Sequence, residues 1–194
     1  MPKLLTIATF ILTCQLTANV ASAQQTTDRP HSYDYAFGSL ALSELDSGGF
    51  EGGASVTLAP NFHAFASYQD WEVSNNVDRS ILQIGAGYHW DIAPNLDLIV
   101  SLAFADSELD TPDPGEIDDD GPIFGAGVRG WLSNEVEYSA EILLDDSLGS
   151  DVDSVLQLGG EYHLNPQFSL GGRVRIDEED TAFFFGGRFY FGNN

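Results

Sequence analysis

The chain has 194 residues, of which 30 are Asp or Glu and 7 are Lys or Arg, so its formal net charge at pH 7 is −23. This length suits one domain, and so acidic a surface makes nucleic acid and anionic lipid clusters poor partners. The single cysteine, Cys14, rules out a disulfide within the chain.

The first 23 residues have the pattern of a secretory signal peptide. An apolar run directly follows Lys3, and small residues end the segment at Ala23. The run is too short for a transmembrane helix. We predict cleavage after Ala23, which removes Lys3 and changes the formal charge from −23 to −24. Residues 24–32 are then expected to be a short periplasmic segment, followed by one domain over residues 33–194.

After this leader, apolar and polar residues alternate with period two in segment after segment, and no stretch keeps a helical period for three turns. The pattern predicts an all-β fold with ten strands, or eight if one hairpin is irregular. The ten segments are Tyr33 to Ser43, Phe50 to Leu58, Phe62 to Trp71, Ser80 to Asp91, Leu96 to Ala105, Pro122 to Leu132, Glu135 to Leu144, Ser154 to Leu164, Phe168 to Ile176 and Thr181 to Phe191.

The connections between these segments alternate between short turns and longer acidic loops. The short ones contain Pro and Asn, which suit tight turns: Ala59-Pro60-Asn61, Ala93-Pro94-Asn95, Ser133-Asn134 and Asn165-Pro166-Gln167. The long ones carry Glu44 and Asp46, Glu72 and Asp78, the run from Asp106 to Asp120, Asp145 to Asp153, and Asp177 to Asp180. Short turns at one end and long loops at the other are typical of bacterial outer-membrane β-barrels, with periplasmic turns and external loops.

The two faces of each segment differ in the same way. Apolar sets that would face lipid are Phe62, Ala64, Ala66 and Tyr68; Leu82, Ile84, Ala86, Tyr88 and Trp90; Leu96, Leu98, Val100, Leu102 and Phe104; and Val136, Tyr138, Ala140, Ile142 and Leu144. The opposite faces are polar and would line a lumen. The first segment is ambiguous, because two apolar sets alternate on opposite faces of it. Tyr33, Tyr35 and Phe37 would lie on one face, and Leu40 and Leu42 on the other. An unpaired sheet edge is not tolerated in hydrocarbon, so the sheet is expected to close, with the first strand meeting the last.

The last segment ends in the alternating aromatic run Phe183 to Phe191. It resembles the C-terminal assembly signal of outer-membrane proteins, and the mature chain is similar to the OmpA-like or OmpX-like family of small barrels. The resemblance implies an up-and-down antiparallel transmembrane barrel, inserted into the outer membrane by the assembly machinery. It also implies lipid and lipopolysaccharide as surroundings, and we expect a monomer.

Most of the basic residues lie on the predicted lumen face, where acidic residues accompany them. The arginines are Arg129, Arg173, Arg175 and Arg188, and the glutamates are Glu51, Glu137, Glu141 and Glu161. An arginine left alone in a narrow interior would cost several kcal/mol, so we predict that these residues form charge pairs that close the lumen. The alternative is a charge-lined pore, or a gate that opens when a pair exchanges partners.

Two patterns could bind a metal ion, and both are incomplete. Glu116, Asp118 and Asp120 start an oxygen-ligand loop, but the twelfth position is Gly127, where a calcium loop needs a bidentate Glu. His63 and His89 could begin a zinc site, although spacing fixes no third ligand. We therefore predict no metal site and no cofactor, beyond Ca²⁺ or Mg²⁺ bound loosely at the acidic loops.

No catalytic motif is present, such as a G-x-S-x-G elbow or H-E-x-x-H, so we predict no enzymatic activity. The leading hypothesis is a structural or surface-interaction barrel with exposed acidic loops. The loops could reach lipopolysaccharide phosphates through bridging divalent cations. The alternative is a narrow channel for small solutes that prefers cations because its external mouth is acidic.

Overall fold

The computed structural model describes residues 31–43, 48–74, 77–110, 117–147, 152–178 and 180–191. The expected signal peptide, its cleavage point at Ala23 and residues 24–30 lie outside the described residues. Within the described part of the chain, no helix is long and apolar enough to cross a membrane.

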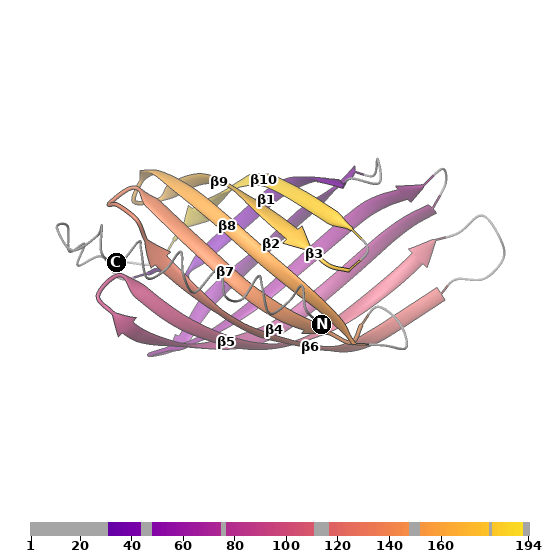
Figure 1. Cartoon of the computed structure of the whole chain (residues 1–194), viewed down its shortest axis with the longest axis horizontal. Coiled ribbons are helices and arrows are strands. Elements are labelled where there is room, and N and C mark those ends of the chain that lie inside the picture. The colour runs from indigo at the N-terminus through magenta and orange to yellow at the C-terminus, as the bar shows by residue number, and fades with distance from the viewer. Residues whose placement is uncertain are drawn as a thin grey trace.

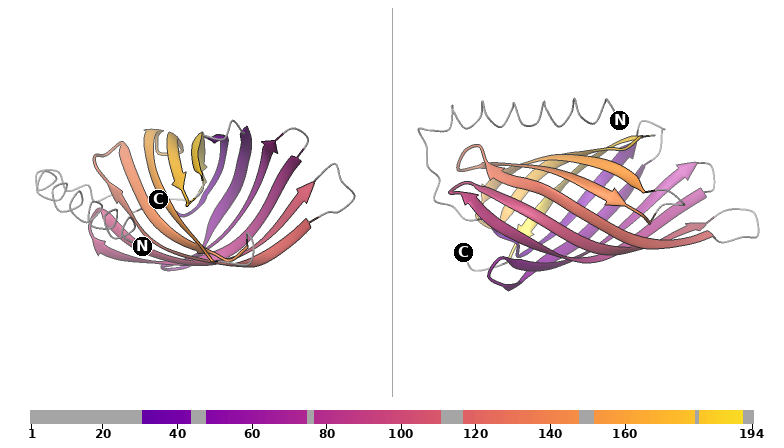
Figure 2. Two further views of the ribbon diagram at one scale, coloured as in Figure 1. Left: turned by 45° about the vertical axis from the view of Figure 1, so that its right-hand side comes forward. Right: turned by 60° about the horizontal axis from the view of Figure 1, so that its bottom comes forward.

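The described chain forms one closed barrel of antiparallel strands that run obliquely to its long axis (Figure 1). The strands are β1 (Tyr35–Ser43), β2 (Gly48–Ala59), β3 (Phe62–Ser74), β4 (Val77–Ala93), β5 (Leu96–Asp110), β6 (Ile117–Trp131), β7 (Val136–Asp145), β8 (Asp153–Asn165), β9 (Phe168–Ile176) and β10 (Thr181–Tyr190). Figure 2 shows from two more sides how the sheet curves round on itself.

The sheet closes between its first and last strands. β1 pairs antiparallel with β10, from Tyr35 opposite Tyr190 to Ser43 opposite Ala182. The prediction of a closed up-and-down barrel with ten strands is confirmed, and the alternative of eight strands is wrong. Each described strand therefore has a paired strand on both sides, so the sheet has no free edge strand in the hydrocarbon.

Outward side chains form an apolar surface around the barrel. Leu40, Ile84 and Phe185 have exposed fractions of 69%, 61% and 59%. A closed barrel with this exterior is stable only when lipid covers it, because water would contact the whole apolar surface. The chain is an outer-membrane barrel, and its outward side chains contact lipid.

The short connections lie at one end of the barrel, here called the turn end; the other is called the loop end. Asn61 has a φ of 69°, the left-handed conformation that Asn tolerates, and its side-chain amide donates to the backbone oxygen of His89 at 2.8 Å. Asn95 donates in the same way to the backbone oxygen of Trp131 at 3.1 Å. In barrels of this type, such an end faces the periplasm and the loop end faces outward.

The acidic run from Asp106 to Asp120 is largely strand rather than loop. β5 continues to Asp110 and β6 begins at Ile117, with Asp106 opposite Asp120. The expectation of one long loop is therefore wrong for most of this run. The hairpin continues because its inward-facing side chains still have partners inside the barrel. Ser107, for example, is buried and accepts a hydrogen bond from Arg79.

The structure also resolves the ambiguous parity of the first strand. Tyr35 and Phe37 point into the lumen, while Leu40 and Leu42 face lipid. Phe37 fits because Gly53 is opposite it: a Cβ on Gly53 would lie 2.7 Å from the Phe37 ring. The lumen therefore contains aromatic rings close to the turn end, where the chain enters the barrel.

Candidate functional site in the barrel lumen

Residues 31–33 enter the lumen at the turn end instead of extending the first strand. Tyr33 is 5% exposed, and its ring lies between His63 and His89, with ring centroids 4.5 Å and 4.1 Å away. The Tyr33 hydroxyl donates to Oδ2 of Asp97 at 2.8 Å. Burial raises the pKa of Tyr33 well above its ordinary value, so the hydroxyl keeps the proton that it donates. β1 thus begins at Tyr35 rather than Tyr33, and part of the expected periplasmic segment is inside the barrel.

A buried ion pair holds this entering segment. Nε and Nη2 of Arg129, on β6, donate to Oε1 and Oε2 of Glu137, on β7, at 2.6 Å and 2.9 Å. The third nitrogen, Nη1, donates to the backbone oxygen of Ser32 at 2.9 Å. One edge of the guanidinium group therefore makes two parallel hydrogen bonds to the carboxylate, and the remaining nitrogen binds the backbone of the segment that enters the lumen.

Further side chains complete the network, here called the turn-end cluster: His31, Arg129, Glu137, Glu161, His163 and Arg188. Arg188 contacts Glu137 at 3.5 Å and Glu161 at 3.4 Å. A ring nitrogen of His31 and one of His163 each lie 3.5 Å from Oε2 of Glu137. Two arginines thus face two glutamates, and Glu137, whose side chain is 2% exposed, contacts four of the other groups.

A cavity of about 210 Å³ lies in the lumen beyond the turn-end cluster. Two more ion pairs cross it or border it: Arg173 contacts Glu51, and Arg175 contacts Asp145 at 3.4 Å. Glu141 accepts a hydrogen bond from Ser101 at 3.2 Å, and among the described residues it has no ion pair within 4.0 Å. All four predicted arginines thus lie in the lumen with acidic partners, one of which, Asp145, was not among the predicted pairs.

The loop half of the lumen is filled by apolar side chains, which the sequence analysis missed. Trp71 and Phe184 meet edge to face at 5.5 Å, and the guanidinium of Arg173 lies 4.2 Å from the Phe184 ring centre. The sequence does contain a signal for this packing, because apolar residues interrupt the otherwise polar lumen-facing positions of these strands. The larger buried cluster on this side consists of Ile81, Ala103, Ala105, Ile123, Leu143 and Val155.

The three acidic candidates of the β5–β6 hairpin are not brought into a described site. Glu116 lies outside the described residues, as does the side chain of Asp118, whose backbone is in β6. Asp120 is exposed and pairs across the sheet with Asp106.

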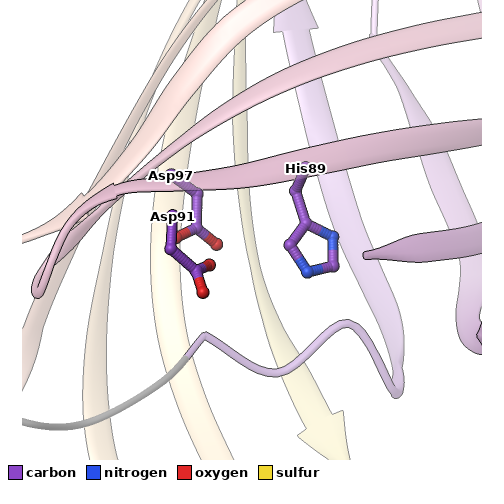
Figure 3. A group of neighbouring side chains, drawn as sticks. All are labelled: His89, Asp91 and Asp97. Carbon is purple, nitrogen blue, oxygen red and sulfur yellow. The ribbon is translucent and has the colours of Figure 1, made fainter. Parts of the chain in front are cut away.

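The two candidate zinc ligands are separated by Tyr33, and their ring centroids are 6.0 Å apart. His89 instead has carboxylates as neighbours, because Asp91 and Asp97 each place a ligand atom within 4.8 Å of its own and of each other's (Figure 3). The sequence analysis named no third ligand, so it missed these two aspartates. Their signal was the tight turn after Asp91, which places Asp97 opposite it on the same face.

No family model matches the chain, and no curated protein matches it. Among solved structures, the KdgM porin is similar with a TM-score of 0.52 and 10% identity, covering 81% of this chain and 99% of its own. The translocator domain of the autotransporter NalP from Neisseria meningitidis has a TM-score of 0.49, 10% identity and coverages of 96% and 97%. The N-terminal barrel domain of Pseudomonas aeruginosa OprF has a TM-score of 0.41, 16% identity and coverages of 82% and 98%.

At these identities the likeness shows the fold alone. The chain has the fold of a small porin-like barrel, as the KdgM porin does. The solved neighbours do not single out the OmpA-like or OmpX-like family that the sequence resembles.

Proposed function

We propose that this chain is an outer-membrane barrel with a structural or surface-interaction role, and that its lumen is closed to solutes by the turn-end cluster. The observation that carries the proposal is the fork between Arg129 and Glu137, which also holds the backbone of Ser32 inside the barrel. A segment of chain fixed in the lumen by buried charges blocks the path that a solute would take.

The cost of opening supports a lumen that stays closed. Moving the segment aside would break the hydrogen bond from Arg129 to the backbone oxygen of Ser32, while the Arg129–Glu137 pair, between two wall strands, would stay in place. A hydrogen bond to a charged group contributes about 1.5–3 kcal/mol. Since every 1.4 kcal/mol is a factor of ten, this bond alone would hold the open fraction to roughly a tenth or less.

With the lumen closed, the working surface is the loop end. Asp106, Glu108, Asp110 and Asp120 are exposed there, on the β5–β6 hairpin. We propose that they attract divalent cations and, through these, lipopolysaccharide phosphates. Removal of divalent cations with EDTA is then expected to lower the stability of the barrel more in lipopolysaccharide-containing membranes than in phosphatidylcholine. An EDTA effect of the same size in both membranes would remove this part of the proposal. Insertion by the outer-membrane assembly machinery belongs to the same proposal.

The test of closure is single-channel conductance of the purified protein in a planar bilayer. Tyr33→Ala removes the ring between His63 and His89 without changing a strand, and Tyr68→Ala, on the lipid face of β3, is its matched control. We expect the native protein and Tyr68→Ala to be silent and Tyr33→Ala to conduct. A silent Tyr33→Ala would assign closure to the apolar loop half and not to the turn end. Steady conductance by the native protein would overturn the proposal.

A second candidate function is a narrow channel for small solutes that prefers cations, in which residues 31–33 act as a gate. The observation that favours it is the cavity of about 210 Å³, bordered by the Arg173 and Arg175 ion pairs, which a purely structural barrel does not need. The KdgM porin shows that a porin can have this fold. Cation-selective openings of the native protein, measured as a reversal potential in a salt gradient, would move this candidate ahead.

A further inference from the structure

We propose that His89, Asp91 and Asp97 bind one divalent transition-metal ion at the turn end of the barrel. All three lie on the lumen face of the β4–β5 hairpin, and their side chains point into the same space (Figure 3). This site is separate from the acidic loops, and it does not depend on whether the lumen conducts.

The hairpin register brings the three ligands together. His89 and Asp91 are two residues apart on β4 and so share a face, and Asp91 pairs directly with Asp97 on β5. The ligand atoms lie within 4.8 Å of one another. Zinc bonds of about 2.0–2.2 Å to nitrogen and oxygen place tetrahedral ligand atoms roughly 3.5 Å apart. Small side-chain rotations are therefore enough to close the site around an ion.

Electrostatics favours a cation here. Like charges directly opposite each other across two strands destabilise a sheet. Asp91 and Asp97 form such a pair, and within the described ranges neither has an arginine or lysine within 4.0 Å. Asp97 is also buried, with an exposed fraction of 5%, so water screens its charge poorly. A divalent ion between the two carboxylates would cancel both charges.

Tyr33 supports two of the ligands from behind. Its hydroxyl hydrogen-bonds Oδ2 of Asp97, which leaves the other carboxylate oxygen for a metal ion. Its ring stacks on His89 at 4.1 Å and fixes the plane of the imidazole. Partners that orient the ligands in this way strengthen metal sites.

The donor set indicates the class of metal. One imidazole with two carboxylates suits Zn²⁺ and neighbouring first-row ions better than Ca²⁺ or Mg²⁺, which prefer oxygen alone. Three protein ligands leave at least one position for water. Asp91 is exposed at the barrel mouth, so an ion can enter from the turn end.

The experiment is calorimetric titration of the EDTA-treated, refolded protein with Zn²⁺, together with the visible absorption of its Co²⁺ complex. We expect saturable binding of one ion per chain. His89→Gln and Asp91→Asn should each weaken binding at least about tenfold, since changes even behind the ligands cost 10–100-fold. His63→Gln is the matched control, because His63 contacts the other face of Tyr33 and is not a ligand.

Because Asp91 is exposed, Asp91→Asn tests the site even if His89→Gln fails to fold, which heat-modifiable migration in detergent gels would reveal. The proposal is overturned by the absence of saturable binding, by undiminished binding in Asp91→Asn, or by an equal loss in His63→Gln. Each of these outcomes is independent of the conductance measurement.

Discussion

The two halves of the lumen are closed by different interactions. In the turn half, the turn-end cluster joins β6, β7, β8 and β10 to the entering segment through charged groups. In the loop half, Ile123, Leu143 and Val155 pack with smaller apolar side chains from the same wall of the barrel. Both sets of side chains fill the space inside the sheet. Only the charged groups of the turn half need hydrogen-bond partners in particular directions.

This difference has consequences for tolerance to change. A buried charge network is stable only while each member keeps its partners, because an unpaired buried charge costs far more than a lost contact. Apolar packing loses stability in proportion to the volume removed. The turn half can therefore fix one particular segment in place, whereas the loop half can only fill space.

The largest effect is expected from Glu137→Ala, which leaves Arg129 and Arg188 without their shared carboxylate. Removing one partner of a buried pair costs about 3–5 kcal/mol. The free energy of unfolding, from urea titration in lipid vesicles, should fall by this amount. Glu141→Ala is the matched control on the same strand, since Glu141 has no ion pair within 4.0 Å among the described residues and accepts a hydrogen bond from Ser101, whose loss should cost much less. Equal losses of unfolding free energy for the two variants would mean that the paired charges of the turn-end cluster contribute no more to stability than a single hydrogen bond does.

A smaller effect is expected in the loop half from Leu143→Ala. Leu143 is buried in the apolar cluster, and truncation of a buried leucine costs 2–5 kcal/mol, here near the lower limit of about 2 because the neighbouring cavity already loosens the packing. The control is Leu144→Ala, the next residue, which faces lipid and leaves no internal cavity. The same urea titration measures both. A loss for Leu143→Ala no greater than for Leu144→Ala would show that the loop half is not packed.

The outside of this barrel could be predicted from the sequence because it depends on local periodicity alone. Leu82, Ile84 and Tyr88 alternate with polar residues, and a period of two places them on one face whatever the neighbouring strands do. The strand number and the closure follow from the alternating turns and from the need to leave no edge in lipid.

The inside could be predicted only in part, because several partners in the lumen come from strands that are not neighbours. Arg173 on β9 meets Glu51 on β2, 122 residues away, across the interior. Such pairs depend on the shear and radius of the closed barrel, which local patterns do not give. The position of Tyr33 has the same origin, since Tyr33 precedes β1 and its three partners lie on β3, β4 and β5, none of which pairs with β1.

The smallest effect is expected from an ion pair on the loop side of the apolar cluster, where Arg175 lies near the loop end of β9 and Asp145 at the loop end of β7. Arg175 is 15% exposed and contacts Asp145 at 3.4 Å, and Asp145 also accepts hydrogen bonds from the backbone and hydroxyl of Ser147. When Arg175→Gln removes the arginine, the carboxylate keeps these donors, so the loss should be about 1 kcal/mol or less. Raising the salt concentration from 0.1 to 1 M shortens the screening length from about 10 to 3 Å and should reduce this loss, because Arg175 is partly exposed. The loss in Glu137→Ala should survive the same change, because salt does not reach a fully buried pair. If both losses shrink in high salt, the turn-end cluster is open to water, and the two halves of the lumen differ in composition but not in how they are closed.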